Sequence, residues 1–458
     1  MKLLAAVLAV VAVFVIVGLG AFRFMVTQLP NYHSEIQAWA RDALGLTLRF
    51  SRLDARWTFS GPELTFHQAS IGERGLRVRE ASIDFNLVKL FTRRQPIVDR
   101  LTLQGMHITV ERTSEGLRLQ GMTSEGDVQV ELGLEDLPPV QVVVRNSSVL
   151  YVDQTSGELP WQFDSVTMTL QRDNERILLE ARAEMPHDLS SRIELSAEGE
   201  LGGTDTPQSG RWRLFVDLRQ VNLAELAQLL PGNVVLPKAG IGNFSLWLNW
   251  QQGELSEATA QLAANNLVLA ETRNKQWEGF SYDDVGVTAE WNRTDIGWQL
   301  ALSNVNLSRN GSVWPDESHI DLSVGLGIDG FDLLSLRANF LRLEDISPLM
   351  SMLPEHMGSY RWIESSPQGD LVDVVLELVG TTEDKWEYQL AAGLRDVGIQ
   401  PVDKLPGVSG LTGDLRTDER SGRFNLSTKD LKFDWPMYFR EPLEVDLLSG
   451  IFLWRRGQ

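Results

Sequence analysis

The residues that most often carry enzymatic or metal chemistry are sparse in this sequence. It contains no cysteine, which excludes disulfides, thiol nucleophiles and cysteine-based zinc or iron–sulfur sites. The histidines never fall within four residues of one another: His33, His67, His107, His187, His319 and His356. We therefore predict no catalytic residue, no metal site and no cofactor.

A glycine-rich string at Gly325–Gly330 has the spacing of a dinucleotide-binding motif. Such a site needs a helix that opens at the third glycine and presents its N-terminus to the pyrophosphate. Here residues 331–343 return to strand-like alternation, so we expect a glycine-rich bend or bulge in a sheet instead. No serine-hydrolase elbow and no P-loop string occurs. An enzyme is the least supported class of function.

The charge balance disfavours nucleic acid as a partner. Lys and Arg total 42 against 62 Asp and Glu, a formal net charge of −20, which repels phosphate backbones. Residues 1–125 are the exception, with 15 basic against 11 acidic side chains. This basic segment is suited to anionic lipid headgroups, although ordinary surface solvation accounts for it equally simply.

The N-terminus contains an uncharged apolar stretch, Leu3–Phe22, bracketed by Lys2 and Arg23. Its twenty residues are long enough to span a hydrocarbon core of about 30 Å. A cleaved signal peptide is the alternative, because Gly18–Gly20 offers small residues at a plausible cleavage site. We predict an uncleaved single-pass anchor at residues 1–24, with the rest of the chain exported. The membrane-facing candidates are Leu3, Val11, Phe14, Val17 and Phe22.

Beyond a short predicted helix at residues 30–44, apolar and polar residues alternate, as in strands with one buried face. Turn-forming pairs such as Asn310–Gly311 separate the runs, which favours antiparallel hairpins and meanders. Three runs have the clearest phase, and their same-face apolar residues are Trp212, Leu214, Val216, Leu218, Phe244, Leu246, Leu248, Ile320, Leu322 and Val324.

Two stretches leave the strand period in the same way. Residues 216–231 and 339–354, which start 123 positions apart, align without gaps. Their identities are Leu218/Leu341, Arg219/Arg342, Leu226/Leu349, Leu230/Leu353 and Pro231/Pro354. Each copy predicts a strand, an N-cap at Asn222 or Asp345, and a short helix, at residues 222–230 and 345–353. We interpret these as a diverged repeat of the kind that stacks into an elongated body.

Several features occur in a distinctive order along the chain. An apolar N-terminal stretch and short helix precede a strand pair at Leu53–Trp57 and Pro62–Phe66; the two strand–helix units and the segments Leu405–Gly413 and Asp434–Leu443 follow. This order resembles the AsmA-like family and, within it, the YhdP-type proteins. Such proteins are much longer, so the resemblance implies that this chain is an amino-terminal portion.

The resemblance also implies a fold and a function. It implies a bridge-like protein of the Gram-negative inner membrane whose periplasmic bulk carries phospholipid toward the outer membrane and supports the permeability barrier. We expect a mainly β protein, with the anchor followed by an elongated, twisted antiparallel β-groove. The expected segments are 1–24 (anchor), 25–125 (membrane-proximal helix and β region), 126–238 (groove repeat) and 239–458 (groove repeats that continue beyond the chain). Phospholipid acyl chains, the inner membrane and envelope proteins are the expected partners.

Alternation alone leaves two architectures open. An open trough would hold lipid acyl chains along its apolar face, whereas stacked sandwiches would bury the same residues as a dry core. The ten same-face residues above are then either groove-lining or core positions. A third interpretation is a periplasmic scaffold or assembly protein for outer-membrane biogenesis, which would act through exposed sheet edges.

Overall fold

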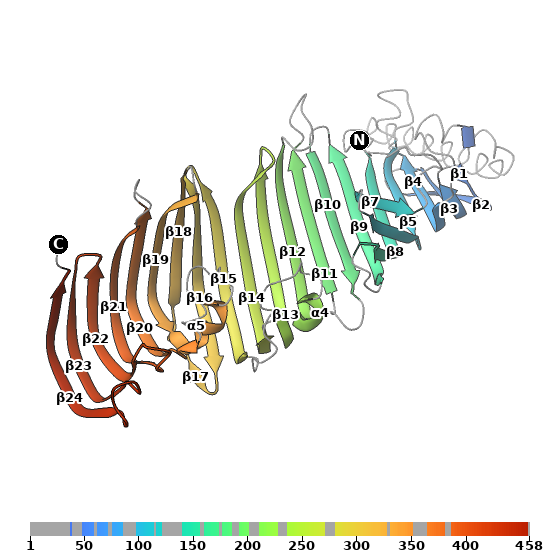
Figure 1. Cartoon of the computed structure of the whole chain (residues 1–458). Coiled ribbons are helices and arrows are strands. Elements are labelled where there is room, and N and C mark those ends of the chain that lie inside the picture. Colours follow the sequence, from blue (N-terminus) through green and yellow to red (C-terminus); the bar gives the residue numbers. More distant parts are fainter. Residues whose placement is uncertain are drawn as a thin grey trace, which may run out of the picture. The chain divides into compact units, whose positions relative to one another are not determined.

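The computed structural model describes residues 37–38, 48–58, 62–71, 76–85, 98–113, 116–120, 140–155, 160–173, 176–185, 192–200, 210–227, 236–270, 280–327, 330–350, 364–380 and 386–456. Most of these residues lie in strands (Figure 1), so the mainly β prediction is confirmed. They divide into unit 1, Met1–His187 with Arg192–Trp212, and unit 2, Asp188–Ser191 with Arg213–Gln458. The two units are described separately below.

The predicted membrane anchor, with Leu3, Val11, Phe14, Val17 and Phe22, lies outside the described residues. Within the ranges given above, no helix combines the length and the apolar character needed to cross a membrane. Of the predicted helix at residues 30–44, only Gln37 and Ala38 are described, and both are helical.

Unit 1 is built from short and medium strands. They are β1 (Leu48–Arg49), β2 (Arg52–Trp57), β3 (Pro62–Ile71), β4 (Leu76–Phe85), β5 (Val98–Gln104), β6 (His107–Thr113), β7 (Gly116–Gln120), β8 (Gln141–Asp153), β9 (Trp161–Asp173), β10 (Arg176–Glu184) and β11 (Arg192–Glu200). Antiparallel pairing joins β2–β3–β4–β5 and β8–β9–β10–β11, and β1 pairs with the far end of β3.

The centre of unit 1 departs from the purely antiparallel expectation. β8 pairs in parallel with both β5 and β6, its first half against β5 and its second half against β6. Gly105 separates β5 from β6 with a φ of 69°, a conformation that glycine adopts without strain, and its N–H donates to the Arg145 carbonyl. The chain therefore bends once and continues along the same partner strand. Periodicity reveals the strands but not their direction, so it could not predict this pairing.

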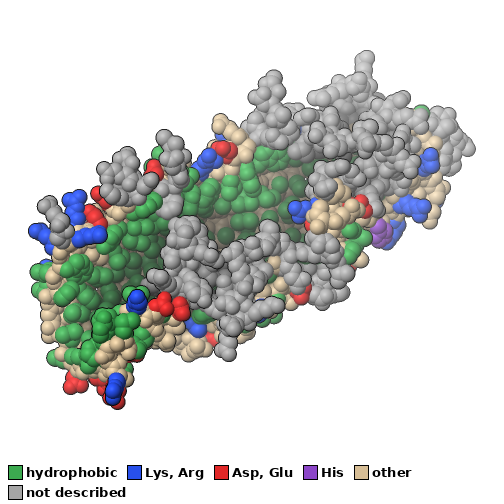
Figure 2. Space-filling model, viewed as in Figure 1, with side chains coloured by type: hydrophobic (Ala, Val, Ile, Leu, Met, Phe, Trp, Pro, Cys, Tyr) green, Lys and Arg blue, Asp and Glu red, His purple; other side chains and the backbone are tan. Residues whose placement is uncertain are grey.

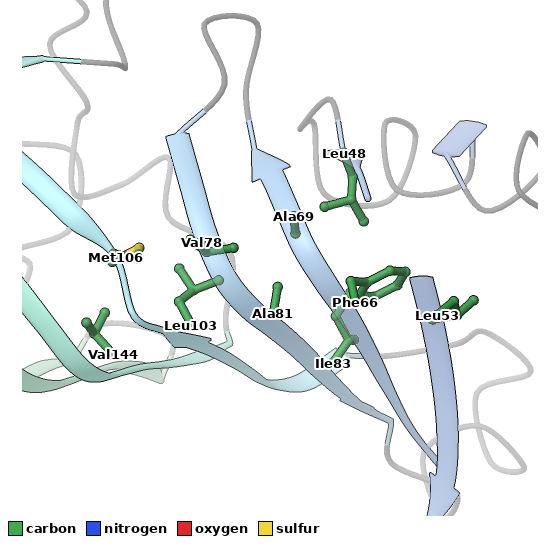
Figure 3. Close-up of a cluster of buried hydrophobic side chains, with 10 residues drawn as sticks. All are labelled: Leu48, Leu53, Phe66, Ala69, Val78, Ala81, Ile83, Leu103, Met106 and Val144. Atoms are coloured by element: carbon green, nitrogen blue, oxygen red, sulfur yellow. The ribbon is translucent and has the colours of Figure 1, made fainter. Parts of the chain in front are cut away.

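One face of unit 1 holds a buried apolar cluster, drawn in Figure 3. Cross-strand partners share a face, and a register row of this face is apolar throughout, running Leu53, Phe66, Ala81, Leu103, Val144, Met168, Ala181 and Leu195. The neighbouring row on the other face begins Asp54, Thr65, Ser82 and Thr102. Phe66 is fully buried and meets Phe50 edge-on at 5.0 Å.

Unit 2 contains longer strands, β13 (Leu236–Gln251), β14 (Glu254–Ala270), β15 (Phe280–Thr294), β16 (Gly297–Arg309), β17 (Ser312–Val313), β18 (Ser318–Gly327), β19 (Gly330–Arg342), β20 (Gln368–Gly380), β21 (Trp386–Ile399), β22 (Gly407–Asp418), β23 (Ser421–Asp434) and β24 (Leu443–Arg455). Residues 213–222 of β12 (Arg211–Asn222) also belong to it. From β13 to β24 all pairings are antiparallel between neighbours, with the short β17 set beside β16.

The glycine-rich string forms part of this ladder. Gly325 and Gly327 lie in β18, and Gly330 opens β19 and pairs with Gly327. A register shift follows Gly325, so the predicted bulge is confirmed and no helix opens at the third glycine.

Two helices follow the strands of the internal repeat, α4 (Leu223–Ala227) after β12 and α5 (Leu343–Met350) after β19. The Asn222 side chain accepts a hydrogen bond from the Ala224 amide at 3.1 Å, which is the geometry of an N-cap. α5 begins earlier than predicted, so Asp345 lies inside its first turn and is not its cap. The predicted helical residues 228–230 and 351–353 lie outside the described residues.

A line of left-handed residues crosses the strands of unit 2 close to these helices. It consists of Gln220, Gly240, Asn266, Asn304, Asp373, Asp396, Gly410 and Asp430, all with positive φ, and we call it the bulge line. Most of these positions coincide with register shifts. Amides freed there find side-chain acceptors on the next strand, as when Gln220 donates to Asn243 Oδ1 and Asp396 donates to Thr412 Oγ1. Such bulges bend the strands that carry them.

Candidate functional site

One face of unit 2 is apolar across strand after strand. The register places Leu248, Ala258, Trp291, Leu300, Leu322, Leu336, Leu376 and Leu390 opposite one another in a single row from β13 to β21. Because directly opposite residues point to the same side, this row defines what we call the apolar face.

The adjacent row, one residue along each strand, points to the other side. It runs Asn249, Glu257, Asn292, Gln299, Ser323, Ser335, Glu377, Gln389 and Asp418 without an apolar member. We call this side the polar face. From β13 to β21 the sheet is therefore amphipathic, with an apolar row on one face and a polar row on the other.

The apolar row is half-buried, and none of its residues falls in the fully buried class. Among the described strands of unit 2, extensive contacts are made only between ladder neighbours and with the helices, so no second sheet packs on this face among them. Figure 2 shows the same face of unit 2 as a hollow lined with hydrophobic side chains, with charged side chains along its margins. The apolar face is therefore partly open along the row; we call this the open part.

The helices close one end of the apolar face. Leu223 of α4 packs with Ala264, Leu267 and Tyr282, and Leu343 of α5 packs in a cluster with Phe340. Ala264 and Phe340 belong to the same face as the row, a few residues further along their strands. Figure 1 shows α4 and α5 against the same ends of the strands, and we call this the covered end.

A polar cluster fastens α5 within the covered end. Asp345, 2% exposed, accepts a hydrogen bond from Trp314 Nε1 at 2.9 Å and lies 3.5 Å from the Arg309 guanidinium. The Tyr282 hydroxyl donates to the Asp345 carbonyl at 2.8 Å. Burial, together with the nearby Asp345 charge, raises the pKa of Tyr282 to about 12. The cluster thus pairs the Asp345 carboxylate with Trp314 and the Asp345 carbonyl with Tyr282 inside the protein, while the buried Nε of Arg309 is left without a hydrogen bond.

The predicted same-face residues fall where their alternation placed them. Phe244, Leu246 and Leu248 share β13, and Ile320, Leu322 and Val324 share β18; register rows connect both sets to the apolar face. All six are half-buried. Their role in holding a ligand remains a proposal, which is taken up below.

β12 joins this face through contacts on its opposite side. Phe215 meets Trp247 at 5.0 Å, and Ser245 donates to Asp217, so these four residues share the polar face. Alternation then puts Leu214, Val216 and Leu218 on the apolar side with Phe244, Leu246 and Leu248. Trp212 lies in unit 1, where its ring lies against Gly199 of β11.

Hydrogen bonding holds Asp217 ionised on the polar face. Burial would raise its pKa, but hydrogen bonds from Ser245 and Arg219 outweigh that effect and lower the pKa below its ordinary value. In unit 1, Arg56 forms a paired hydrogen bond with Glu63 at 2.6 and 2.8 Å and lowers the pKa of Glu63. Burial and the Glu63 charge raise the pKa of neighbouring Asp84. These groups interact with one another and form no acid–base pair directed at a cleft.

Sequence reasoning missed several residues of the apolar face. Leu300 and Leu302 alternate in β16 as clearly as the chosen residues, and Leu334, Leu336 and Ala338 do so in β19. Counting period-two matches in every run would have found them. In β14 the apolar face includes Ala258 and Ala260, whose small side chains give a weak hydrophobic signal.

No group of three or more histidine or carboxylate side chains suited to a metal ion occurs among the described residues. His67 contacts Asp54 at 2.8 Å on the exposed polar side of unit 1, and His107 contacts Ser148 at 2.6 Å. The most extensive chemical feature of the described chain is thus the apolar face.

Comparison with known proteins agrees with this picture. Over 232 residues, 48% of this chain, the sequence is 27% identical to the intermembrane phospholipid transporter YhdP of Escherichia coli strain K12. That match covers only 18% of the relative, which is named for transport and not for a reaction. No solved structure matches significantly. The YhdP protein family profile matches residues 1–458, and the chain therefore belongs to the YhdP family.

Proposed function

We propose that this chain transports phospholipid between membranes by holding acyl chains on the apolar face of its sheet. The observation that carries the proposal is the apolar row of unit 2, which crosses β13 to β21, is backed by a polar row and is only half-buried. The E. coli relative is named an intermembrane phospholipid transporter, which supports the same activity here.

The energetics suit a carrier of acyl chains. Each methylene group that leaves water for an apolar surface contributes about 0.8 kcal/mol, so an acyl chain lying on the apolar face is held without any polar contact. The affinity is spread over many equivalent Leu, Val and Ala side chains. A lipid can then move between neighbouring strands without breaking one dominant interaction, and no cofactor is needed.

In the cell, the chain is anchored in the inner membrane by residues 1–24, and its bulk lies in the periplasm. Phospholipid moves along the β-groove toward the outer membrane and supports its permeability barrier. The uncharged stretch Leu3–Phe22 and membership of the YhdP family support this arrangement. A reporter fused after Gln458 is expected to be active only when exported, whereas a soluble mature protein starting near Ala21 would contradict the anchor.

Photo-crosslinking tests the lipid-binding face directly. A photoreactive amino acid at Leu246 or Leu322 should capture phospholipid in cells, because both side chains lie on the apolar face. The matched controls are Ser245 and Ser323, one residue away on the polar face, where we expect no lipid adduct. Equal lipid adducts at the apolar-face and polar-face positions, or no adduct at either apolar position, would contradict the proposal.

A periplasmic scaffold or assembly role is a second candidate, and one observation favours it. β24 exposes large apolar side chains such as Leu447 (63%) and Leu453 (69%). Exposed apolar patches often mark sites of protein–protein contact. A stoichiometric protein partner that co-purifies without lipid would favour this role over transport.

A further inference from the structure

The apolar face of unit 2 changes character along its strands. At the covered end, apolar side chains are buried beneath α4 and α5. The middle is largely aliphatic, as in the register row Leu246, Ala260, Ala289, Leu302 and Ile320. At the opposite ends of the strands, where the hairpins turn, aromatic residues gather: Trp250, Trp291, Trp298, Trp386, Tyr388 and Trp454. We call this margin the hairpin rim.

The register puts these aromatic residues on the apolar face. Trp291 lies opposite Leu300 and Tyr388 opposite Leu378, whereas Trp298 lies between Val324 on one side and Arg293 on the other. Trp454 lies opposite Gly422, and its ring lies against that glycine. Trp250 follows Leu248 by two residues, and Trp386 precedes Tyr388 by two. The rim aromatics therefore border the same surface that we propose to hold acyl chains.

The rim aromatics differ from the two that bond Asp345 in the covered end, although the β23–β24 connection at the same strand ends also exposes Tyr438 and Phe439. Trp314 and Tyr282 are 4% and 3% exposed, and their polar atoms bond Asp345 inside the protein. Along the rim, by contrast, Trp298 is half-buried and Trp386 is 45% exposed. Tryptophan and tyrosine combine an apolar ring with a polar atom, and they concentrate where an apolar phase meets water.

Charged groups of both signs stand within the rim, where Arg293 lies opposite Trp298, and just beyond it. Arg293 and Glu254 form an ion pair at 2.7 Å between neighbouring hairpins, and Arg455 and Arg456 are exposed at the end of β24. Going from the hairpin tips inward, a zone of charged and aromatic side chains gives way to aliphatic ones. This is the order in which a bilayer leaflet passes from headgroups through the interface to acyl chains.

The depth of the aliphatic zone also fits one lipid tail. On β21, Tyr388 at the rim and buried Ala392 are four residues apart, or about 13 Å at ~3.3 Å per residue. One leaflet contributes half of a ~30 Å hydrocarbon core, about 15 Å. A phospholipid with its headgroup at the rim would therefore place the ends of its tails near α4 and α5.

From this geometry we infer that phospholipid lies across unit 2 in one orientation, with the headgroup at the hairpin rim and the acyl ends toward the covered end. The inference rests on the proposed transport function and adds a direction to it. The reverse orientation would bring a headgroup against Leu223 and Leu343, where the buried Asp345 already bonds Trp314 and Arg309.

Two photoreactive phosphatidylcholines test the orientation on the purified full chain in detergent. One carries a diazirine at the end of an acyl chain, and the other carries it on the headgroup; adducts are mapped by peptide mass spectrometry. The acyl probe should label residues near Leu302, Ile320 and Phe340. The headgroup probe should label the hairpins around Arg293, Glu387 and Arg420.

The outcomes separate this inference from the proposed function. Reversed labelling, or both probes labelling the same residues of the apolar face, would overturn the orientation and leave lipid transport intact. Labelling by neither probe, or labelling confined to the polar face, would overturn lipid binding itself.

A variant sharpens the test at one hairpin. The double substitution Trp291→Leu and Trp298→Leu keeps the surface apolar but removes the amphipathic rings. Headgroup labelling around Arg293 should fall roughly fivefold, with acyl labelling near Ile320 retained. Trp247→Leu, which removes a tryptophan from the polar face, is the matched control and should change neither. Equal labelling by the double variant and the unsubstituted chain would contradict a role for the rim aromatics.

Discussion

Leu336 and Ala338 stand two residues apart on the same face of β19, yet their surroundings differ. Leu336 lies in the open part and is half-buried, whereas Ala338 lies in the covered end and is 4% exposed. The strand, the ladder and the side-chain phase are the same on both. What differs is the cover: α5 and Trp314 pack over one region, and no described element packs over the other.

The comparison shows that alternation predicts which residues share a face of the sheet but not whether that face is buried or open. The apolar side of one strand can contribute to a dry core and, a few residues away, to a surface in contact with water. The difference arises because a short helix covers one part of the strand and excludes water from it. Whether an apolar strand face becomes a dry core or an open surface is therefore determined locally, and in unit 2 both occur on the same strands.

A buried charge should separate the two regions most strongly. Ala338→Asp places an unpaired carboxylate in the covered end, which costs several kcal/mol or more and should unfold unit 2. Leu336→Asp in the open part leaves the carboxylate within reach of water, so the unit should stay folded while lipid capture falls. Circular dichroism and limited proteolysis report folding. Unfolding of both variants would mean that the open part is itself a closed core.

Truncation of a large side chain should show the same contrast at smaller scale. Phe340→Ala removes a ring that is 4% exposed and packed against Trp314, and it should lower the free energy of unfolding by about 3–5 kcal/mol. Leu322→Ala removes a half-buried side chain and should cost about 1 kcal/mol. Urea denaturation compares the two. Similar losses of unfolding free energy in the two variants would show that the covered end and the open part are equally buried.

High pH should weaken the covered end through Tyr282. Its pKa is raised to about 12, against about 10 for an exposed tyrosine, so its stabilising contribution is complete below pH ~10. The contribution is lost as the pH rises from there toward 12. Tyr282→Phe should cost about 0.5–1.5 kcal/mol at pH 7 through the lost hydrogen bond.

The same variant should lose less stability than the unsubstituted protein between pH 10 and 12, since it has no hydroxyl to ionise. Denaturant midpoints measured along this pH range give the comparison. Parallel curves for the two proteins would show that Tyr282 ionises freely in the folded state.

The smallest effect is expected for a glycine in the bulge line. Asn304 has a φ of 52°, which glycine tolerates and a β-branched residue does not. Asn304→Gly should change stability by only a few tenths of a kcal/mol, whereas Asn304→Val should cost about 1–2 kcal/mol. Thermal unfolding of the two variants provides the measurement. Equal melting temperatures would mean that the left-handed conformation imposes no constraint on this residue.

The apolar face could be predicted from the sequence because successive residues of a strand point to opposite faces, so the alternation of apolar and polar residues assigns each one to a face. Leu246 and Leu322 were assigned to one face, and Ser245 and Ser323 to the other, from alternation alone. The repeat indicated the positions of α4 and α5 because helical spacing of leucines interrupts that alternation.

What the sequence could not supply depends on distant contacts. Asp345 was interpreted as a helix cap, but its partners Trp314 and Arg309 lie about 30 residues earlier, and no local pattern points to them. The parallel pairing of β8 with β5 and β6 was missed for the same reason. The rim aromatics are far apart in the sequence, and only the strand register shows that they lie along one margin of the sheet.

The bulge line constrains backbone conformation far more than residue identity. Its positions carry Gln, Gly, Asn or Asp, residues that can adopt a left-handed φ, and nothing else about them needs to be shared. Any of these residues should therefore substitute for another with little effect on the bend. A search for regularly placed Asn, Asp or Gly within strand-like runs would thus detect this geometry where aligned residue identities are few.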